Sequence, residues 1–206
     1  MNTTDFWDKR APKYDESIRK HDPLYERTIQ GATALLSESD VTLDFACASG
    51  EMSLDIAPHV RSVHGVDLSA KMIELARQKA RDRRAKNVRF DPIDVFDPML
   101  ANHTFSTVFA FNIFHLLNDA PRVLARLNEL LTPGGLLVSQ TPCLGERNWL
   151  FRFLIGAAQK TGLAPTIQSF NPAGLETLVS GGGFKILESK TWDEKTALRW
   201  IVGRKA

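Results

Sequence analysis

The sequence has few cysteines, no long apolar run and almost no net charge, and each shortage excludes a class of protein. Two cysteines in 206 residues, Cys47 and Cys143, are too few for a disulfide framework or, by themselves, for a zinc site. Lys and Arg number 26 against 24 for Asp and Glu, so the net charge gives no reason to expect a nucleic acid partner. The longest apolar run, 149–158, is interrupted by Arg152 and is too short to cross a bilayer.

The start of the chain and its composition narrow the class further. The opening stretch MNTTDFWDKRAPKYDES is polar and charged, so we expect no secretory signal. Hydrophobic residues make up 43% and charged residues 24%, as in folded globular proteins, and the length fits a single domain over 1–206. We therefore predict a cytoplasmic enzyme or binding protein with no membrane partner and no metal site.

Short apolar runs alternate with stretches of helical spacing through the middle of the chain. One helix is expected after Ser69, and another after Asp119 that ends at Pro133-Gly134-Gly135. The apolar runs are rich in β-branched and aromatic residues and are short enough for buried strands: VTLDFA (41–46), SVHGVD (62–67), VRFDPID (88–94), FSTVFAFN (105–112) and GLLVSQT (135–141). This alternation predicts βαβ units, and hence an α/β fold with a mostly parallel sheet and helices on both faces.

The two ends of the chain follow different patterns. Residues 1–40 have only helix-like spacing, with a break expected near Pro12, and are interpreted as a helical cap in front of a core at 41–141. The apolar segment 148–159 and a short helix at 172–180 fall in 142–182, interpreted as a lid over an apolar small molecule. In the last part, 183–206, FKILES and TALRWIVGR predict a closing antiparallel hairpin.

The turn after the first predicted strand is the first candidate for a ligand site. Ligands of open α/β sheets bind beyond the carboxyl ends of the strands, near the point where the strand order reverses. Here the turn consists of small residues, Ala46-Cys47-Ala48-Ser49-Gly50, which let a ligand approach the backbone. Asp67 follows Asp44 by 23 residues at a strand end, as does the usual acceptor of ribose hydroxyls.

Two ligand classes use this geometry, and the charges favour one of them. A dinucleotide site needs G-x-G-x-x-G, but these three positions fall on Ala46, Ala48 and Glu51. The carboxylates of Glu51 and Asp44 would repel a pyrophosphate. A ligand with positive charge and no phosphate, such as S-adenosylmethionine, meets no such repulsion.

Several ordered motifs together resemble those of class I S-adenosylmethionine-dependent methyltransferases. The run VTLDFACASG (41–50) resembles their first motif, in which an acidic residue precedes G-x-G-x-G. The later motifs are similar to VHGVDLSAKMIELARQKA (63–80), VRFDPIDVFD (88–97), FSTVFAFNIFHLLND (105–119) and LLTPGGLLVS (130–139), and FWDKRAPKYDES (6–17) is similar to the opening helix of small-molecule members. The resemblance implies a Rossmann-like, doubly wound, seven-stranded sheet in three α/β/α layers, with S-adenosylmethionine as cofactor. Ala46 and Ala48 depart from the motif, and alanine fits this turn where φ stays negative.

The resemblance assigns a part of the cofactor to each matching position. The methionine moiety would lie against Asp44 and the turn from Ala46 to Gly50, and Asp67 would accept the ribose hydroxyls. Further contacts are implied for the adenine at Leu68, Met72, Asp94 and Val95, and near the amino acid end at Asn112; within the turn the implied contacts are Ala46, Ala48, Ser49 and Gly50.

The predicted reaction is methyl transfer to a small organic acceptor, with His115 or Tyr14 as general base where the acceptor needs one. Two alternatives remain open at this point. One is an RNA methyltransferase that uses the basic cluster at 77–89, where Asp82 is the only acidic residue before Asp91. The other is a protein that binds S-adenosylmethionine without catalysis. The sequence does not identify the acceptor or the oligomeric state.

Overall fold

The computed structural model of the chain describes residues 3–17, 23–100, 105–143, 145, 167–194 and 197–206, and its centre is one seven-stranded sheet. The strand order is β3-β2-β1-β4-β5-β7-β6. Among the described residues, β7 pairs antiparallel with β5 and β6, and the other strand pairs are parallel. The strands are β1 (Val41–Phe45), β2 (Ser62–Val66), β3 (Val88–Asp91), β4 (Phe105–Phe111), β5 (Leu131–Pro142), β6 (Phe184–Asp193) and β7 (Leu198–Lys205). The predicted mostly parallel sheet with a closing hairpin is confirmed.

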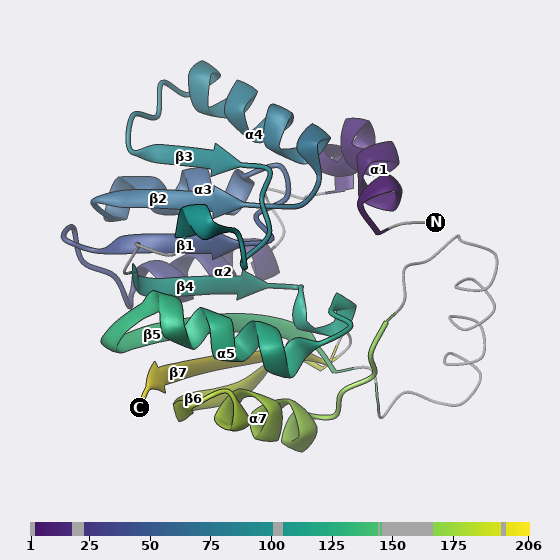
Figure 1. Ribbon diagram of the computed structural model, residues 1–206, viewed down its shortest axis with the longest axis vertical. Helices are drawn as coiled ribbons and strands as arrows, with labels where there is room; N and C mark the ends of the chain where they lie inside the picture. The colour runs from purple at the N-terminus through teal and green to yellow at the C-terminus, as the bar shows by residue number, and fades with distance from the viewer. Residues whose placement is uncertain (1–2, 18–22, 101–104, 144, 146–166, 195–196) are drawn as a thin grey trace.

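Helices cover both faces of the sheet and complete three layers (Figure 1). On one face α5 and α7 pack against a core that includes Leu43, Val108 and Ile201. On the other face α2, α3 and α4 enclose two smaller apolar clusters. The helices are α1 (Thr3–Ser17), α2 (Pro23–Thr33), α3 (Glu51–Ile56), α4 (Ala70–Asp82), α5 (Ala120–Leu130) and α7 (Pro172–Gly181), with single 3-10 turns η1 (Ala57–His59), η2 (Pro98–Leu100) and η3 (Phe114–Leu116).

Side-chain caps begin three of these helices where the sequence predicts them. Ser69 accepts a hydrogen bond from the backbone N–H of Met72 at 3.2 Å, and Asn171 accepts one from that of Gly174 at 2.7 Å. Asp119 caps α5 in the same way. The end of α5 differs slightly from the prediction, because Leu131 already has extended dihedrals and begins β5 before Pro133 is reached.

Helix α1 contradicts the predicted break near Pro12, since it continues through that residue to Ser17. A proline inside a helix removes one backbone hydrogen bond and crowds the preceding turn. Phe6 and Ala11 are both buried, with 6% and 2% of their surface exposed, so packing of this face offsets the local penalty.

Only part of the range 142–182, interpreted as a lid, lies within the described residues. The segment 148–159 lies outside them. Helix α7, which belongs to the same range, packs its Leu175 and Val179 into the main core beside α5. No helix among the described residues is long and apolar enough to cross a membrane.

Candidate functional site

A cavity of about 390 Å³ opens at the carboxyl ends of β1, β2 and β4, beneath α1. In Figure 1 this is the end of the sheet toward which the arrows of β1 to β4 point and where α1 lies. It adjoins β1 and β4, the neighbouring strands at which the chain reverses its direction of progress across the sheet. The charged side chains among the described lining residues are all carboxylates: Asp44, Glu51, Asp67 and Asp94. Aromatic lining comes from Trp7, Tyr14, Tyr25, Phe45, Phe96 and Phe111.

Asp67 directly follows β2, and backbone N–H groups hold its carboxylate in place. Its Oδ2 accepts a hydrogen bond from the N–H of Ala48 at 3.0 Å, and its Oδ1 accepts one from that of Ser69 at 2.8 Å. Burial raises the pKa of Asp67, the two N–H groups oppose that rise, and the nearby charge of Asp8 adds to it. Each carboxylate oxygen accepts a single hydrogen bond from the protein in this arrangement and retains capacity for a ligand donor such as a hydroxyl.

The turn after β1 adopts a strained backbone at both of its alanines. Ala46 has φ of 59° and Ala48 has φ of 48°, in the left-handed region that favours glycine. The condition that φ stays negative is therefore not met. The motif's glycine geometry is retained with alanine side chains, and both residues line the cavity.

Asp44 lies at the floor of the cavity and is almost completely buried, with 3% of its surface exposed. Burial raises its pKa to about 7, a hydrogen bond from the hydroxyl of Ser53 opposes the rise, and the charge of Asp67 adds to it. A cationic ligand in the cavity would favour the ionised form of this carboxylate.

Ser49 and Gly50 are the last two residues of the turn and are not among the described lining residues. Ser49 is buried, and its Oγ accepts a hydrogen bond from Lys79 Nζ at 2.9 Å. Gly50 has φ of 75°, and a Cβ there would lie 2.7 Å from Phe90 Cζ and 2.8 Å from Ala76 Cβ. Glycine is therefore required at this position by the close approach of β3 and α4.

The remaining predicted cofactor contacts all line the cavity. Leu68 is 53% exposed there, whereas Met72 is 1% exposed and also belongs to the core. Asp94 accepts a hydrogen bond from the backbone N–H of Phe96 at 2.7 Å through Oδ1, so it also shapes its own turn. Val95 is buried, and Asn112 is exposed at the end of β4 with φ of 55°.

A chain of polar contacts beside the cavity was missed by the sequence reasoning. Tyr25 of α2 lines the cavity and donates a hydrogen bond from its hydroxyl to Asp55 Oδ2 at 2.7 Å. Asp55 pairs with Arg83 at 2.8 Å, and Arg83 also pairs with the buried carboxylate of Glu51. Burial and the hydrogen bond to Asp55 raise the pKa of Tyr25, so this phenol is unsuited to act as a base. No signal in the sequence links these residues, because they come from three separate helices or helix ends.

The two predicted bases differ in their placement. Tyr14 lines the cavity from α1, with its ring 6.2 Å from that of Trp7 in an edge-to-face arrangement. His115 is not among the described lining residues, and its buried Nδ1 has no hydrogen-bond partner in the described part of the chain. Burial lowers the pKa of His115 to about 4, so the ring is neutral near pH 7.

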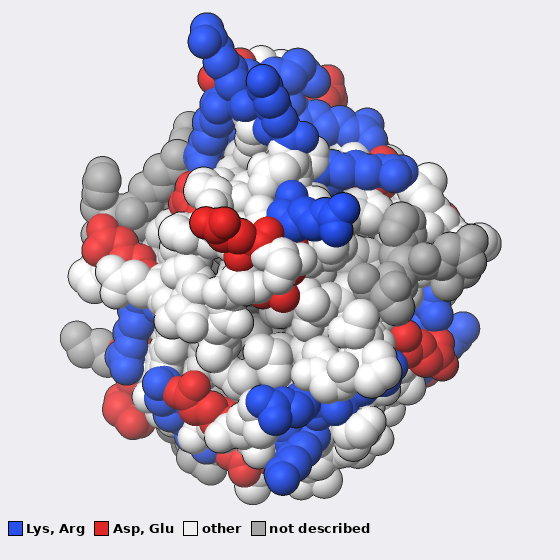
Figure 2. All heavy atoms as spheres, turned by 90° about the vertical axis from the view of Figure 1, so that its left-hand side faces the viewer, with Lys and Arg blue, Asp and Glu red and all other residues white. Residues whose placement is uncertain are grey.

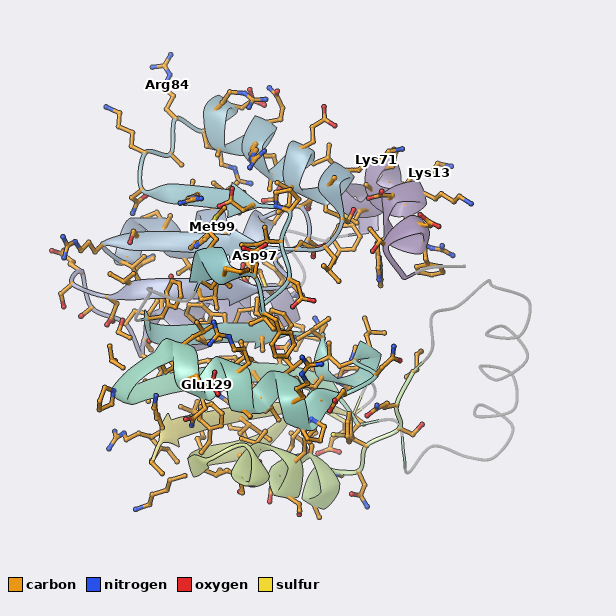
Figure 3. The ribbon with its side chains drawn as sticks, in the orientation of Figure 1. Lys13, Lys71, Arg84, Asp97, Met99 and Glu129 are labelled. Atoms are coloured by element: carbon orange, nitrogen blue, oxygen red, sulfur yellow. The ribbon has the colours of Figure 1, made fainter. Side chains whose placement is uncertain are left out.

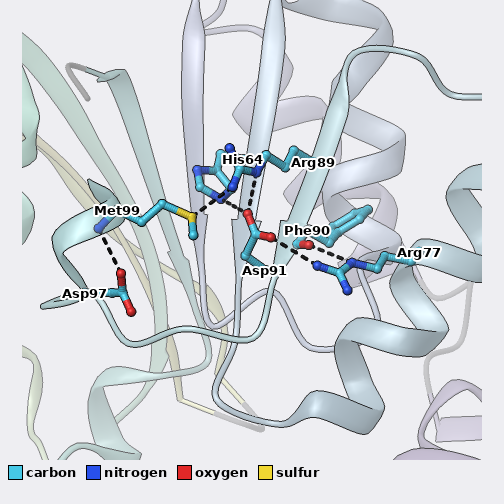
Figure 4. A network of polar contacts seen from close by, with 7 residues as sticks. All are labelled: His64, Arg77, Arg89, Phe90, Asp91, Asp97 and Met99. Atoms are coloured by element: carbon cyan, nitrogen blue, oxygen red, sulfur yellow. Dashed lines mark hydrogen bonds and ion pairs between the residues drawn. The ribbon is translucent and has the colours of Figure 1, made fainter. Parts of the chain in front are cut away.

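Four of the Lys and Arg residues in the basic cluster at 77–89 are paired with carboxylates outside it. Arg77 and Arg89 both contact Asp91, and His64 Nε2 lies 2.8 Å from Asp91 Oδ2 (Figure 4). Burial disfavours ionisation of Asp91, but hydrogen bonds from His64 and Arg89 outweigh it and lower the pKa. Lys and Arg side chains still gather at the top of the face in Figure 2. Figure 3 shows Arg84 there, at the end of α4 away from α1.

Comparison with known proteins agrees with this geometry. Residues 42–135 match the family model of a methyltransferase domain. An uncharacterized methyltransferase of Anoxybacillus flavithermus is 27% identical over 163 residues, or 76% of this chain and 74% of that protein. A 2-phytyl-1,4-naphtoquinone methyltransferase of Nostoc sp. is 30% identical over 136 residues, covering 62% of this chain and 58% of the relative.

The fold is shared with solved structures at lower identity. The N-methyltransferase NodS of Bradyrhizobium japonicum, solved in complex with S-adenosyl-L-homocysteine, superimposes with a TM-score of 0.72 at 16% identity, over 100% of this chain and 99% of that one. The ordered sequence motifs, the family match and the cavity at the end of β1 agree with one another. Residues 42–135 match a methyltransferase domain, and the chain is similar to the class I S-adenosylmethionine-dependent methyltransferases.

Proposed function

We propose that this methyltransferase methylates a small organic acceptor bound against the aromatic wall of the cavity. The observation that carries the proposal is that one part of the cavity lining consists of carboxylates and another part of aromatic side chains. Carboxylates converge from the ends of β1, β2 and β3, while Trp7 and Tyr14 of α1 and Tyr25 of α2 supply an aromatic wall. A planar, mostly apolar acceptor fits such a wall. The Nostoc relative, named for a naphthoquinone substrate, supports an acceptor of this kind.

The residues present fit S-adenosylmethionine. The two oriented oxygens of Asp67 suit a ribose diol, and the exposed side chain of Leu68 offers an apolar surface to the adenine. The buried carboxylate of Asp44 suits a cationic group. When bound, the cofactor supplies a methyl group on a sulfonium, whose neutral thioether is a good leaving group.

The contribution of the chain to the reaction is then mainly positional. Alignment of the acceptor with the methyl group and exclusion of water lower the barrier without further chemistry. A neutral amine needs no base for the attack, because its nitrogen lone pair is nucleophilic enough to displace the thioether directly. For a hydroxyl acceptor, Tyr14 is supported as the base by its place in the lining, and His115 is retained as the second candidate.

The two alternatives receive different support. Four of the seven cations in the basic cluster are held by carboxylates, because Arg77 and Arg89 contact Asp91 and Lys79 and Arg83 contact Glu51. This favours a structural role for the cluster over RNA binding. A non-catalytic binding protein differs from an enzyme in turnover alone.

Calorimetric titration with S-adenosylhomocysteine tests the proposal, with NAD as the control ligand. We expect saturable binding to the wild type, loss of at least tenfold in affinity for Asp67→Ala, and unchanged affinity for Asp82→Ala, an exposed carboxylate on α4. Transfer of a labelled methyl group to a panel of planar phenols, quinols and amines then tests catalysis. Binding without transfer to any of them would contradict the proposed acceptor class, and equal binding by Asp67→Ala would contradict the cofactor site.

A further inference from the structure

Helix α1 supplies Thr4, Trp7 and Tyr14 to the cavity wall, and an aspartate on the same helix fastens it to α4. The Oδ1 atom of Asp8 accepts a hydrogen bond from Ser69 Oγ, and the backbone N–H of Lys71 reaches the same oxygen at 3.4 Å. Ser69 is the N-cap of α4, so the carboxylate of Asp8 lies at the positive end of that helix. Figure 3 shows α1 beside the start of α4, with Lys13 of α1 and Lys71 of α4 on the same side of the molecule.

Ser69 also belongs to the wall that holds Asp67. Its backbone N–H donates to Asp67 Oδ1 at 2.8 Å, and Asp67 Oδ2 accepts the N–H of Ala48 at 3.0 Å. A continuous series of hydrogen bonds therefore connects α1, the start of α4, the end of β2 and the turn after β1. These are the segments that surround the cofactor end of the cavity.

We propose that Asp8 is a positioning residue that couples the seating of α1 over the cavity to the occupation of Asp67 by the cofactor. The inference rests on the proposed function, because it takes Asp67 as the ribose acceptor. A ligand bound to Asp67 holds the carboxylate in the orientation that accepts the N–H of Ser69, and the hydroxyl of the same serine then meets Asp8. Seating of α1 in turn places Trp7 and Tyr14 over the acceptor.

The charges give this coupling its direction. Asp8 and Asp67 are two carboxylates bonded to one serine, and their repulsion contributes to the raised pKa of Asp67. This repulsion weakens the seating of α1 in the empty protein. Ribose hydroxyls that donate to Asp67 offset its charge and reduce this repulsion, so α1 closes more firmly when the ligand is bound. Coupling between two equilibria is reciprocal. If the bound cofactor favours the seated position of α1 by a given factor, seating of α1 raises cofactor affinity by the same factor. Loss of the Asp8 contact must therefore weaken cofactor affinity.

Hydrogen exchange measured by mass spectrometry on the full chain tests this inference. In the wild type, S-adenosylhomocysteine should slow exchange of the α1 amides. In Asp8→Ala the α1 amides should exchange about tenfold faster without ligand, the change expected for loss of a hydrogen bond to a charged group. Ligand should no longer slow them, although it still protects the start of α4. Asp5→Ala, an exposed aspartate on α1, should behave as the wild type. Asp8→Asn keeps an oxygen acceptor without the charge and should restore most of the slow exchange.

The outcomes separate the coupling from the function on which it rests. Equal α1 exchange in ligand-free wild type and Asp8→Ala would overturn the role of Asp8, whether or not a ligand binds. A ligand response of α1 that persists in Asp8→Ala would overturn the coupling. Failure of S-adenosylhomocysteine to bind the wild type would refute the proposed function instead. If Asp8→Ala exchanges faster in β4 and β5 as well, the protein is globally destabilised, and failure of Asp8→Asn to restore slow α1 exchange then overturns the proposal.

Discussion

Replacement of either alanine in the turn after β1 by glycine should stabilise the protein, the reverse of the usual effect. Ala46 and Ala48 have φ of 59° and 48°, where an L-residue with a Cβ loses about 1–2 kcal/mol. Glycine removes this penalty but loses about 0.5–1 kcal/mol more backbone entropy on folding. The difference is a gain of about 0.5–1 kcal/mol for each replacement. At about 2–4 °C per kcal/mol for a chain of this size, Tm should rise by about 1–4 °C.

Thermal unfolding of the ligand-free protein measures this gain, and two other positions calibrate it. Arg84→Gly, at φ of 54° and remote from the cavity, should raise Tm by a similar amount. Gly50→Ala should lower it, because φ is 75° and the new Cβ would lie 2.7 Å from Phe90 Cζ. A lower Tm for both Ala46→Gly and Ala48→Gly, with the calibrating variants behaving as expected, would refute the strain argument.

Two further predictions concern ionisation and catalysis. The pKa of Asp44 in the folded protein is about 7, above its value in the unfolded chain, so the folded protein binds this proton more tightly. The free energy of unfolding therefore falls as the pH rises from about 4 to 7. Asp44→Asn should therefore raise the Tm of the ligand-free protein at pH 8 but not at pH 4. In the wild type, affinity for S-adenosylmethionine should decrease about tenfold per pH unit below 7, and titrations of Asp44→Asn should lack this slope. Tyr14→Phe should lower kcat for a hydroxyl acceptor by about 10²-fold or more while cofactor affinity is kept, and equal kcat would exclude this base. His115→Ala tests the second candidate by the same kinetic comparison.

The fold could be predicted from the sequence because its strands and helices carry local signals. The apolar runs mark the strands of the parallel core, and Ser69 and Asp119 cap their helices as their sequence neighbours suggest. The position of Asp67, directly after β2, followed from the same pattern. Pro12 shows the limit of this reasoning, since burial of the helix face around it outweighs a strong local preference.

The parts of the site that sequence reasoning missed depend on contacts between distant segments. Tyr25 reaches Asp55 across 30 positions, and Asp8 reaches Ser69 across 61. No periodicity reports such pairs, because they form only when whole helices pack together. The turn alanines are a different case, because alanine ordinarily avoids positive φ and gives no indication that it will adopt it here.

The position of β7 in the sheet has a consequence for how the protein is made. This strand is the last of the seven along the chain, yet it lies between β5 and β6, with Trp200, Ile201 and Val202 buried. During synthesis, β6 therefore has no neighbour to pair with until residues 198–205 have left the ribosome. Until then, the edge of β5 and the unpaired β6 expose backbone N–H and C=O groups that can pair with other nascent chains. Completion of the sheet therefore requires the last strand of the chain, and the edge of β5 is open to other chains until β7 covers it.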